Sequence, residues 1–500
     1  MTPAIIVIVN IDDIKSPLPP RRVSVLSDPP SPPPPAPPVQ APTLVTKPKK
    51  FTQPFLIGGI ILFVFIIIFV IVKFLIPAFG GKNTPSVTLN YWGLWENSSI
   101  MTGIISDFEA QNPGIKINYK MQDKTDYRSR LAGRLAKNPE TDEVPDIFRI
   151  HSSWLPMFSS SLSPVPAATL SKIDFEKDFY EVYKKDLKVG GSYYAIPLMY
   201  DGLSLFYNKD LLQKGGVDLP KSWFDLQTAA AKLTVRDEQG RIQVAGVAMG
   251  TTDNVDQWSD IVALLISQNG ADILVDTPEN DTKLKDVLAY YTNFRNKYKT
   301  WDDTLVNSTE LFIQGKLAFY FGPSWKVFKI EDENPNLSFD IITVPQLPTL
   351  ENISDSSPNS TANLTNIHYA TYWVEAVNSK SKHQKEAWKF LEFLASKDSL
   401  EKMYATAKQS GRSFGEIYPR ISLGTGLAAE SKLKPFISAA NFAKSDYLAD
   451  NTSDSGLNSE LKKYFSDAIN NPALDNSDPS AVLTDLKNGL NQIIQKYHLK

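Results

Sequence analysis

The apolar positions are continuous near residue 60 and become periodic after about residue 85. Residues 55–72 contain no charge, and the apolar run resumes after Lys73 as far as residue 79. A hydrocarbon core about 30 Å thick is crossed by about 20 apolar residues in a helix, and a lysine near one end can reach the interface. The run is longer than the roughly 7–15 apolar residues of a cleaved signal peptide and lies far from Met1. The pattern therefore predicts one transmembrane helix over residues 55–79.

Alternating and helical patterns follow one another beyond the linker at residues 80–85. Residues 87–92 alternate and are rich in strand formers, residues 100–110 place apolar side chains at helical spacing, and residues 115–119 alternate again. Similar patterns predict a helix containing Leu131 and Leu135, strands over 146–150, 203–209 and 244–249, helices over 223–233, 261–268, 383–394 and 481–497, and a surface loop over 349–366. This succession predicts an α/β fold with a parallel or mixed sheet covered by helices.

Length, cysteine content and charge narrow the classes of protein. A chain of 500 residues is long for one hydrophobic core, so we expect at least two lobes. The absence of cysteine excludes disulfides, thiolate metal sites and a lipid-modified cysteine anchor. The 52 basic and 55 acidic residues give a formal net charge of -3 without a basic stripe, which argues against nucleic-acid binding.

The flanks of the apolar run predict its orientation. Lys47, Lys49 and Lys50 precede it, whereas only Lys73 and Lys82 follow closely, so the N-terminus is expected inside the cytoplasmic membrane and the rest outside. Residues 1–54 are expected to be a disordered cytoplasmic tail, because residues 1–50 hold 14 of the 35 prolines. The tail could attract a proline-recognising partner, but a solvated spacer is the favoured interpretation.

Six blocks of sequence carry a resemblance to a known family. They are DFEAQNPGIKI at 107–117; PDI at 145–147, followed by Trp154; AIP at 195–197 with LFYNKDL at 205–211, LPKSW at 219–223 and AKLT at 231–234; FIQGKLAF at 312–319 with GPSW at 322–325; VPQLP at 344–348; and VNSKSK at 377–382 before AWKFLEFL at 387–394. In this order they make residues 86–497 resemble the bacterial extracellular solute-binding proteins of the maltose-binding type, the sugar-capturing subunits of ABC importers. The uncleaved anchor, the missing lipid cysteine and the proline-rich tail depart from that family.

The resemblance implies two α/β lobes joined by hinge strands, with the ligand buried in the cleft between them. Closure of hinged lobes is a change that a transporter can sense. We expect crossings near 200–203, 370–374 and 417–421, one lobe from 86–200 plus 375–417, and another from 203–370 plus 421–497. The expected protein is a monomer without cofactor or metal that binds a carbohydrate or another polar small molecule and contacts importer permease subunits.

A sugar site needs aromatic planes for C–H faces and rigid polar groups for hydroxyls. By the resemblance, Asp201 matches a ligand-binding carboxylate and Trp325 a stacking aromatic. Position near strand ends or near the expected cleft adds Trp95, Glu96, Ser152, Trp154, Tyr200, Trp258, Tyr372, Trp373 and Arg412. For Asp201 the alternative is a structural role at the hinge, and Arg412 could pair with a carboxylate instead. Trp92, Trp223 and Trp388 are interpreted as core, and Trp301 is left unassigned.

Enzymatic alternatives have less support. The four histidines show no metal-ligand spacing, and the chain has neither a G-x-S-x-G elbow nor a phosphate-binding glycine loop. A glycoside hydrolase would need two facing carboxylates, which the sequence cannot exclude. A ligand-sensing ectodomain for a membrane receptor is a further alternative, although no signalling domain is attached. Residues 253–256 fail the calcium-loop pattern and are interpreted as a capped helix start.

Overall fold

A computed structural model describes residues 86–348, 364–449, 455–471 and 480–499. The predicted transmembrane helix, the proline-rich tail, the linker and most of the predicted loop at 349–366 lie outside the described residues. In the described part of the chain, no helix combines the length and the apolar character needed to cross a membrane. Residues 82–500 form one compact unit.

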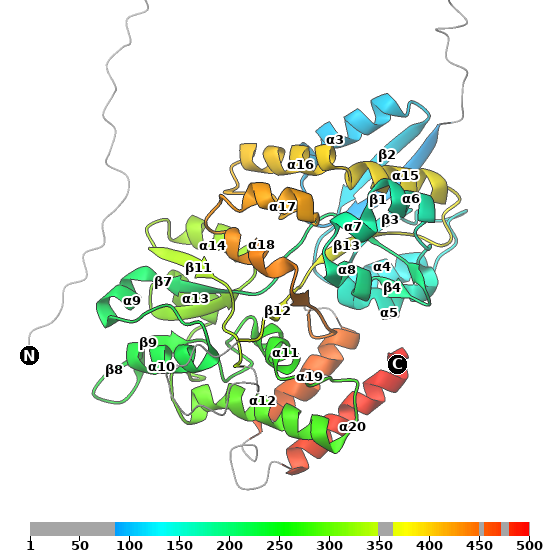
Figure 1. Cartoon of the computed structure of the whole chain (residues 1–500). Coiled ribbons are helices and arrows are strands. Elements are labelled where there is room, and N and C mark those ends of the chain that lie inside the picture. Colours follow the sequence, from blue (N-terminus) through cyan, green and yellow to red (C-terminus); the bar gives the residue numbers. More distant parts are fainter. Residues whose placement is uncertain (1–85, 349–363, 450–454, 472–479, 500) are drawn as a thin grey trace, which may run out of the picture. The chain divides into compact units, whose positions relative to one another are not determined.

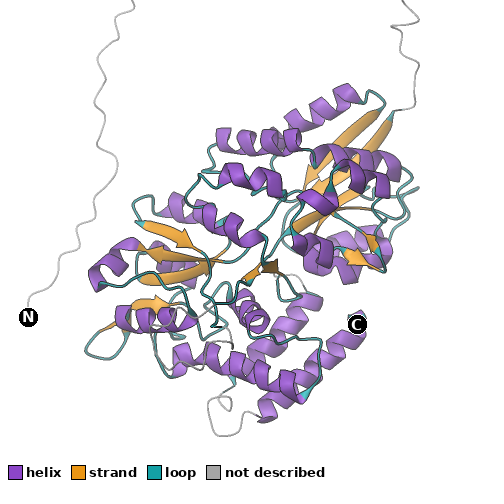
Figure 2. Ribbon diagram, viewed as in Figure 1, coloured by secondary structure: helices purple, strands orange, loops and turns teal. Residues whose placement is uncertain are grey.

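The first of two five-stranded sheets has the strand order β2-β1-β3-β13-β6 (Figures 1 and 2). Its strands are β1 Val87–Gly93, β2 Ile115–Met121, β3 Ile147–His151, β6 Ile196–Pro197 and β13 Trp373–Val377. Strand β1 is parallel to β2 and β3, whereas β13 is antiparallel to β3 and β6. Helix α3, Ser98–Gln111, connects β1 to β2 and begins where the Asn97 side chain accepts a hydrogen bond from the backbone of Ile100.

The second sheet has the order β11-β7-β10-β9-β8 and a similar cover of helices. Its strands are β7 Ser204–Asn208, β8 Val235–Arg236, β9 Ile242–Val247, β10 Leu317–Gly322 and β11 Phe339–Ile342. Strand β7 is antiparallel to β10 and β11, whereas β9 and β10 are parallel. Helix α10, Trp223–Leu233, packs on this sheet and starts at a capping box formed by Ser222 and Asp225.

The other elements connect and cover the two sheets. They are α4 Tyr127–Leu135, η2 Ser152–Trp154, α5 Leu155–Phe158, η3 Ser159–Ser161, α6 Ala167–Lys172, α7 Phe175–Asp178, α8 Glu181–Asp186, β4 Lys188–Val189, β5 Ser192–Tyr193, α9 Lys209–Gly215, α11 Trp258–Gln268, α12 Pro278–Asn296, α13 Ser308–Ile313, α14 Lys326–Glu333, β12 His368–Tyr369, α15 Gln384–Leu394, α16 Lys397–Gln409, α17 Ile421–Leu427, α18 Lys434–Ala440, β14 Ala443–Lys444, α19 Leu457–Asn470 and α20 Ser480–Tyr497.

The predicted succession of strands and helices is confirmed, with shifts at several ends. The extended run predicted to continue through residue 209 stops at Asn208, whose side chain accepts hydrogen bonds from the backbone of Asp210 and Leu211 and so caps α9. The predicted capped helix start at 253–256 is wrong. Helix α11 begins later and has no side-chain cap, and the Asn254 side-chain oxygen instead accepts hydrogen bonds from Thr251 and Trp301.

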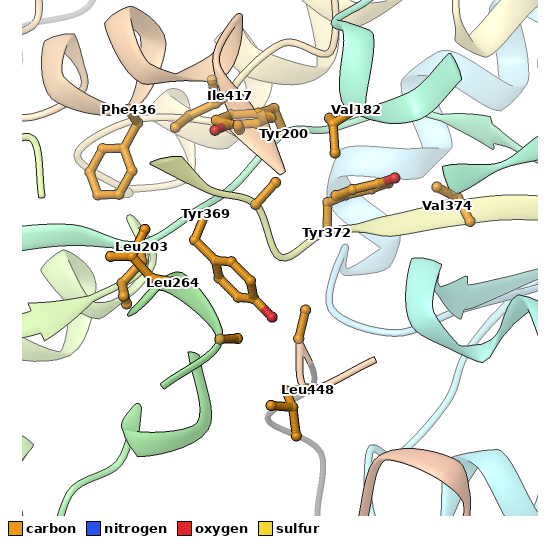
Figure 3. Close-up of a cluster of buried hydrophobic side chains, with 14 of the residues drawn as sticks. Val182, Tyr200, Leu203, Leu264, Tyr369, Tyr372, Val374, Ile417, Phe436 and Leu448 are labelled. Carbon is orange, nitrogen blue, oxygen red and sulfur yellow. The ribbon is translucent and has the colours of Figure 1, made fainter. Parts of the chain in front are cut away.

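Three chain segments lie side by side between the sheets. The backbone N–H of Tyr200 donates to the carbonyl of Ile417 at 2.8 Å, and that of Leu203 donates to the carbonyl of Tyr369 at 2.9 Å. A Cβ atom at Gly202 would lie 2.4 Å from the Tyr369 oxygen, so this close approach requires glycine. Figure 3 shows the buried side chains that surround these segments. The three segments contain residues of the three predicted crossings, and the division of the chain into lobes at these points stays a prediction.

Candidate binding site

One edge of the first sheet gathers aromatic side chains. Strands β1 and β3 are parallel, and β13 is antiparallel to β3. The carboxyl ends of β1 and β3 therefore lie at the same edge of the sheet as the amino end of β13. The rings of Trp95 and Trp373 are in edge contact there, with centroids 5.4 Å apart, and His151 lies 5.2 Å from Trp373. Both tryptophans are partly exposed. This edge therefore brings together two partly exposed indoles.

A buried ion cluster lies beneath these indoles. Arg149 Nη1 donates to both carboxylate oxygens of Glu96, at 2.7 and 2.6 Å, and Arg149 Nε donates to Glu375 Oε1 at 2.6 Å. All three residues are less than 9% exposed. Burial raises the pKa of Glu375, although the Arg149 guanidinium opposes the shift. Glu96 is thus a paired carboxylate at the edge of the site.

Four of the predicted site residues are buried behind this edge. Trp154 is fully buried and its ring contacts those of Tyr127, Phe158 and Trp373. Ser152 is buried and donates its backbone N–H to the carbonyl of Tyr372. The side chains of Tyr372 and Tyr200 are also buried, as Figure 3 shows. In this conformation they pack the core and the crossings, and they do not present a face to a ligand.

Asp201 is held at the first crossing by protein donors. Its Oδ1 accepts from the backbone of Gly202 at 2.7 Å and from that of Ser324 at 2.9 Å, and its Oδ2 accepts from the Ser324 hydroxyl at 2.9 Å. Burial raises the pKa of Asp201 to about 7 despite these hydrogen bonds, which favour the charged form. These hydrogen bonds fit the structural role raised as the alternative for this residue, and Oδ2 keeps capacity for one more donor.

Trp325 follows the same turn and is an exposed aromatic residue. It precedes α14, keeps 45% of its surface exposed, and has the Lys326 ammonium 4.9 Å from its ring centroid. Lys326 in turn pairs with Asp256 at 2.9 Å. Asp256 lies just before α11, so the pair connects this turn to the start of that helix. Trp258, the first residue of α11, is 9% exposed. The Trp325 ring therefore keeps exposed surface, whereas Trp258 is mostly covered.

Arg412 pairs with a carboxylate, the alternative that the sequence had left open. Its Nη2 donates to Glu416 Oε1 at 2.8 Å, and its guanidinium lies 4.4 Å from the ring centroid of Phe328. Burial raises the pKa of Glu416, and Arg412 opposes the shift. Glu96, Arg149, Arg412 and Glu416 all line one cavity of about 30 Å³, which has room for one or two water molecules. One cavity therefore borders both the Arg149–Glu96 pair and the Arg412–Glu416 pair.

Several polar residues near the crossings were missed at the sequence level. Arg149 and Glu375 could have been found, because each is a charged residue inside an otherwise apolar strand. Asp186 and Asp446 gave no such signal. They accept hydrogen bonds from the hydroxyls of Tyr372 at 3.0 Å and Tyr369 at 2.8 Å. Burial raises their pKa values to about 7 for Asp186 and about 6 for Asp446.

Comparison with known proteins identifies the class of this arrangement. Residues 103–411 match the family described as bacterial extracellular solute-binding protein. The multiple sugar-binding protein of Streptococcus mutans is 22% identical over 334 residues, which cover 65% of this chain and 74% of that protein. The maltodextrin-binding protein MdxE of Bacillus subtilis is 24% identical over 192 residues, or 35% of this chain and 42% of that protein.

Solved structures share the fold. The sugar-binding protein MalE of Xanthomonas citri superimposes with a TM-score of 0.64 at 19% identity, covering 83% of this chain and 98% of that chain. The cyclic alpha-maltosyl-1,6-maltose binding protein of Arthrobacter globiformis gives a TM-score of 0.62 at 16% identity, covering 82% and 100%. These likenesses establish the two-lobed α/β architecture expected from the sequence.

Proposed function

Because the chain belongs to the bacterial extracellular solute-binding protein family, whose members are binding proteins and not enzymes, we propose that it captures a carbohydrate between its lobes and delivers it to an ABC importer. The observation that carries the proposal is the exposed indole of Trp325, which directly follows Ser324, the residue that donates two hydrogen bonds to the buried Asp201 carboxylate. A flat apolar ring and a rigid acceptor suit a sugar, which offers apolar C–H faces and hydroxyl donors.

The opposite side of the site would be formed by the edge of the first sheet. Trp95 and Trp373 are partly exposed there, and the Glu96 carboxylate lies between that edge and the cavity shared with Arg412. We assign direct contacts to these residues and to Asp201, Trp258 and Trp325. Ser152, Trp154, Tyr200 and Tyr372 would support the site from the core instead. The names of the sugar-binding relatives favour a carbohydrate over other polar solutes.

The proposal includes a membrane anchor. The support is in the sequence, where residues 55–79 form an apolar run preceded by three lysines. The N-terminus would lie inside the cytoplasmic membrane, with one pass through it and the binding lobes outside. Tethering keeps a binding protein close to its permease, which fits a chain without the lipid-modified cysteine of other anchored binding proteins.

A thermal-shift screen tests the carbohydrate assignment. Residues 82–500 form a compact unit and can be screened without the apolar run. A ligand at 100 times its dissociation constant adds about 2.7 kcal/mol to the free energy of unfolding, so a bound sugar should raise the melting temperature clearly. The panel includes sugars, amino acids and short peptides. Stabilisation by an amino acid or peptide, with none by any sugar, would refute the assignment.

A further inference from the structure

Trp95 and Glu96 are adjacent residues at the carboxyl end of β1, and both contact one buried side chain. The Arg149 guanidinium lies 4.5 Å from the ring centroid of Trp95 and donates from Nη1 to both oxygens of Glu96. Arg149 is 3% exposed. It thus lies inside the sheet and supports two residues that the proposed site presents to the ligand.

The far side of the guanidinium is fixed as well. Arg149 on β3 and Glu375 on β13 are direct partners in the antiparallel register, and both Nε and Nη2 of Arg149 lie 2.6 Å from Glu375 Oε1. A guanidinium is planar and presents its donors in a rigid fork, so bonding on both edges determines the orientation of its face. The plane against which the Trp95 indole rests is therefore set by Glu375 and Glu96 together.

We propose that Arg149 is a positioning residue of the binding site, which holds the Trp95 ring and the Glu96 carboxylate in the orientation that a ligand meets. The inference rests on the proposed function for its biological meaning, and on the contacts above for its geometry. Lysine cannot replace arginine in this role, because an ammonium is a point charge without a plane or a fork. Glu375 contributes by orienting Arg149 and makes none of the described contacts with the Trp95 ring.

The test separates positioning from general stabilisation. The full chain is labelled with 5-fluorotryptophan, and the signal of Trp95 among the nine tryptophans is assigned from Trp95→Phe. Arg149→Lys should shift or broaden the Trp95 fluorine signal, while the signal of the distant Trp223 stays unchanged. The matched variant Glu375→Gln alters the same buried cluster but keeps the fork and the shape of its partner. It should leave the Trp95 signal near its original position, because a glutamine side-chain oxygen can still accept from both Nε and Nη2 of Arg149 and so keep the guanidinium plane.

Two results would overturn the proposal. One is a Trp95 signal that is unaffected by Arg149→Lys, and the other is an equal displacement in both variants, which would indicate a merely structural cluster. If Arg149→Lys does not fold, the variant with Glu96→Gln, Arg149→Gln and Glu375→Gln removes all three buried charges and keeps a polar side chain at each position. The same displacement of the Trp95 signal is expected there, and an undisturbed signal contradicts the role.

A binding measurement distinguishes failure of this inference from failure of the proposed function. With maltotetraose as the probe, Arg149→Lys and Trp95→Phe should each weaken binding about tenfold, and the double variant should lose clearly less than the product of the two losses, because part of the Arg149 effect passes through Trp95. Additive losses would contradict the positioning role. Failure of the unaltered chain to bind maltotetraose counts only against a maltodextrin ligand, since the fluorine signals decide the positioning by themselves.

Discussion

Asp201 and Ser324 are joined by two hydrogen bonds of 2.9 Å, because both the backbone N–H and the hydroxyl of Ser324 donate to the Asp201 carboxylate. The bonds connect the first crossing between the sheets to the turn that follows β10. Trp325 is the next residue after that turn. The turn that carries Trp325 is therefore attached to a buried carboxylate at the point where the chain passes between the two sheets.

This carboxylate should make stability depend on pH. Burial raises the pKa of Asp201 to about 7, well above the value near 4 of an unfolded aspartate. Between these values the folded state holds a proton that the unfolded state has lost, so the free energy of unfolding should fall as pH rises from about 4 to about 7. The slope from one such group is at most about 1.4 kcal/mol per pH unit.

Asp201→Asn tests this dependence. The amide cannot ionise, so the variant should lose one such contribution to the slope, while the contributions of Asp186 and Asp446, which have the same sign, remain. Urea unfolding of residues 82–500 at several pH values measures the slope. Glu238→Gln, in the exposed turn before β9, is the control and should keep the original slope. An unchanged slope in Asp201→Asn would show that the carboxylate is ionised in the folded state throughout this range.

Trp325→Ala should weaken sugar binding and leave the fold nearly intact. The indole is 45% exposed, so its main contribution would be the apolar face it offers to a ligand. Truncation of a large aromatic contact costs about 2 kcal/mol or more of binding free energy. Titration calorimetry measures the affinity for the sugar found by the screen. Phe224→Ala removes another exposed aromatic, 68% exposed on α10, and should not change the affinity.

Trp154→Ala should have the opposite effect: it should lower the stability of the fold strongly instead of acting mainly on sugar binding. The ring is fully buried among Tyr127, Phe158 and Trp373, and removal of a core tryptophan costs about 3–5 kcal/mol of stability. Chemical denaturation of residues 82–500 measures the loss. A loss below about 1 kcal/mol together with a large loss of sugar affinity would return Trp154 to the group of direct ligand contacts.

These contrasts show what the sequence can and cannot predict. The alternation at 87–92 and the helical spacing at 100–110 lie on elements that pack locally, so β1 and α3 were predicted close to their observed ends. The 19 residues of α12 were not predicted, because the helix carries many polar residues and its apolar face is narrow. Its stability comes from packing against α11, which is a tertiary effect.

The candidate site was predicted only in part, for a related reason. Position after a strand indicates that a residue lies at the edge of a sheet, but it does not say whether the side chain points outward or into the core. Trp95 and Trp154 both follow strands, and only the first keeps exposed surface. Arg149 pairs with Glu375 and Asp201 accepts from Ser324, and each of these partners lies more than 100 residues away, so no local pattern could have supplied them.

Gly456 should tolerate no side chain. Its φ of 144° is in the region that favours glycine, and a Cβ atom would lie 2.9 Å from Arg128 Cζ and 3.0 Å from Met157 Sδ. Gly456→Ala should therefore destabilise the chain by about 1–3 kcal/mol, measured by denaturation. Gly426→Ala is the matched control, because that helical glycine has open space around its Cβ position. The control should be neutral or stabilising by up to about 1 kcal/mol, and an equal effect of the two changes would contradict the crowding argument.

Proteolysis of intact cells tests the proposed anchor. Three lysines precede the apolar run at 55–79, and positively charged flanks stay on the cytoplasmic side, so the binding lobes should be outside and remain attached. Protease added to cells without an outer membrane, or to spheroplasts, should cleave the segment after residue 82, whereas an epitope at the N-terminus should be protected until the membrane is lysed.

Replacing Lys47, Lys49 and Lys50 by glutamine should weaken this orientation, while replacing three exposed lysines of the folded unit should not. Release of residues 82–500 from untreated cells, or protection of that region from external protease, would rule out the single-pass topology, and it would leave the fold and the binding predictions unaffected because they do not depend on the apolar run.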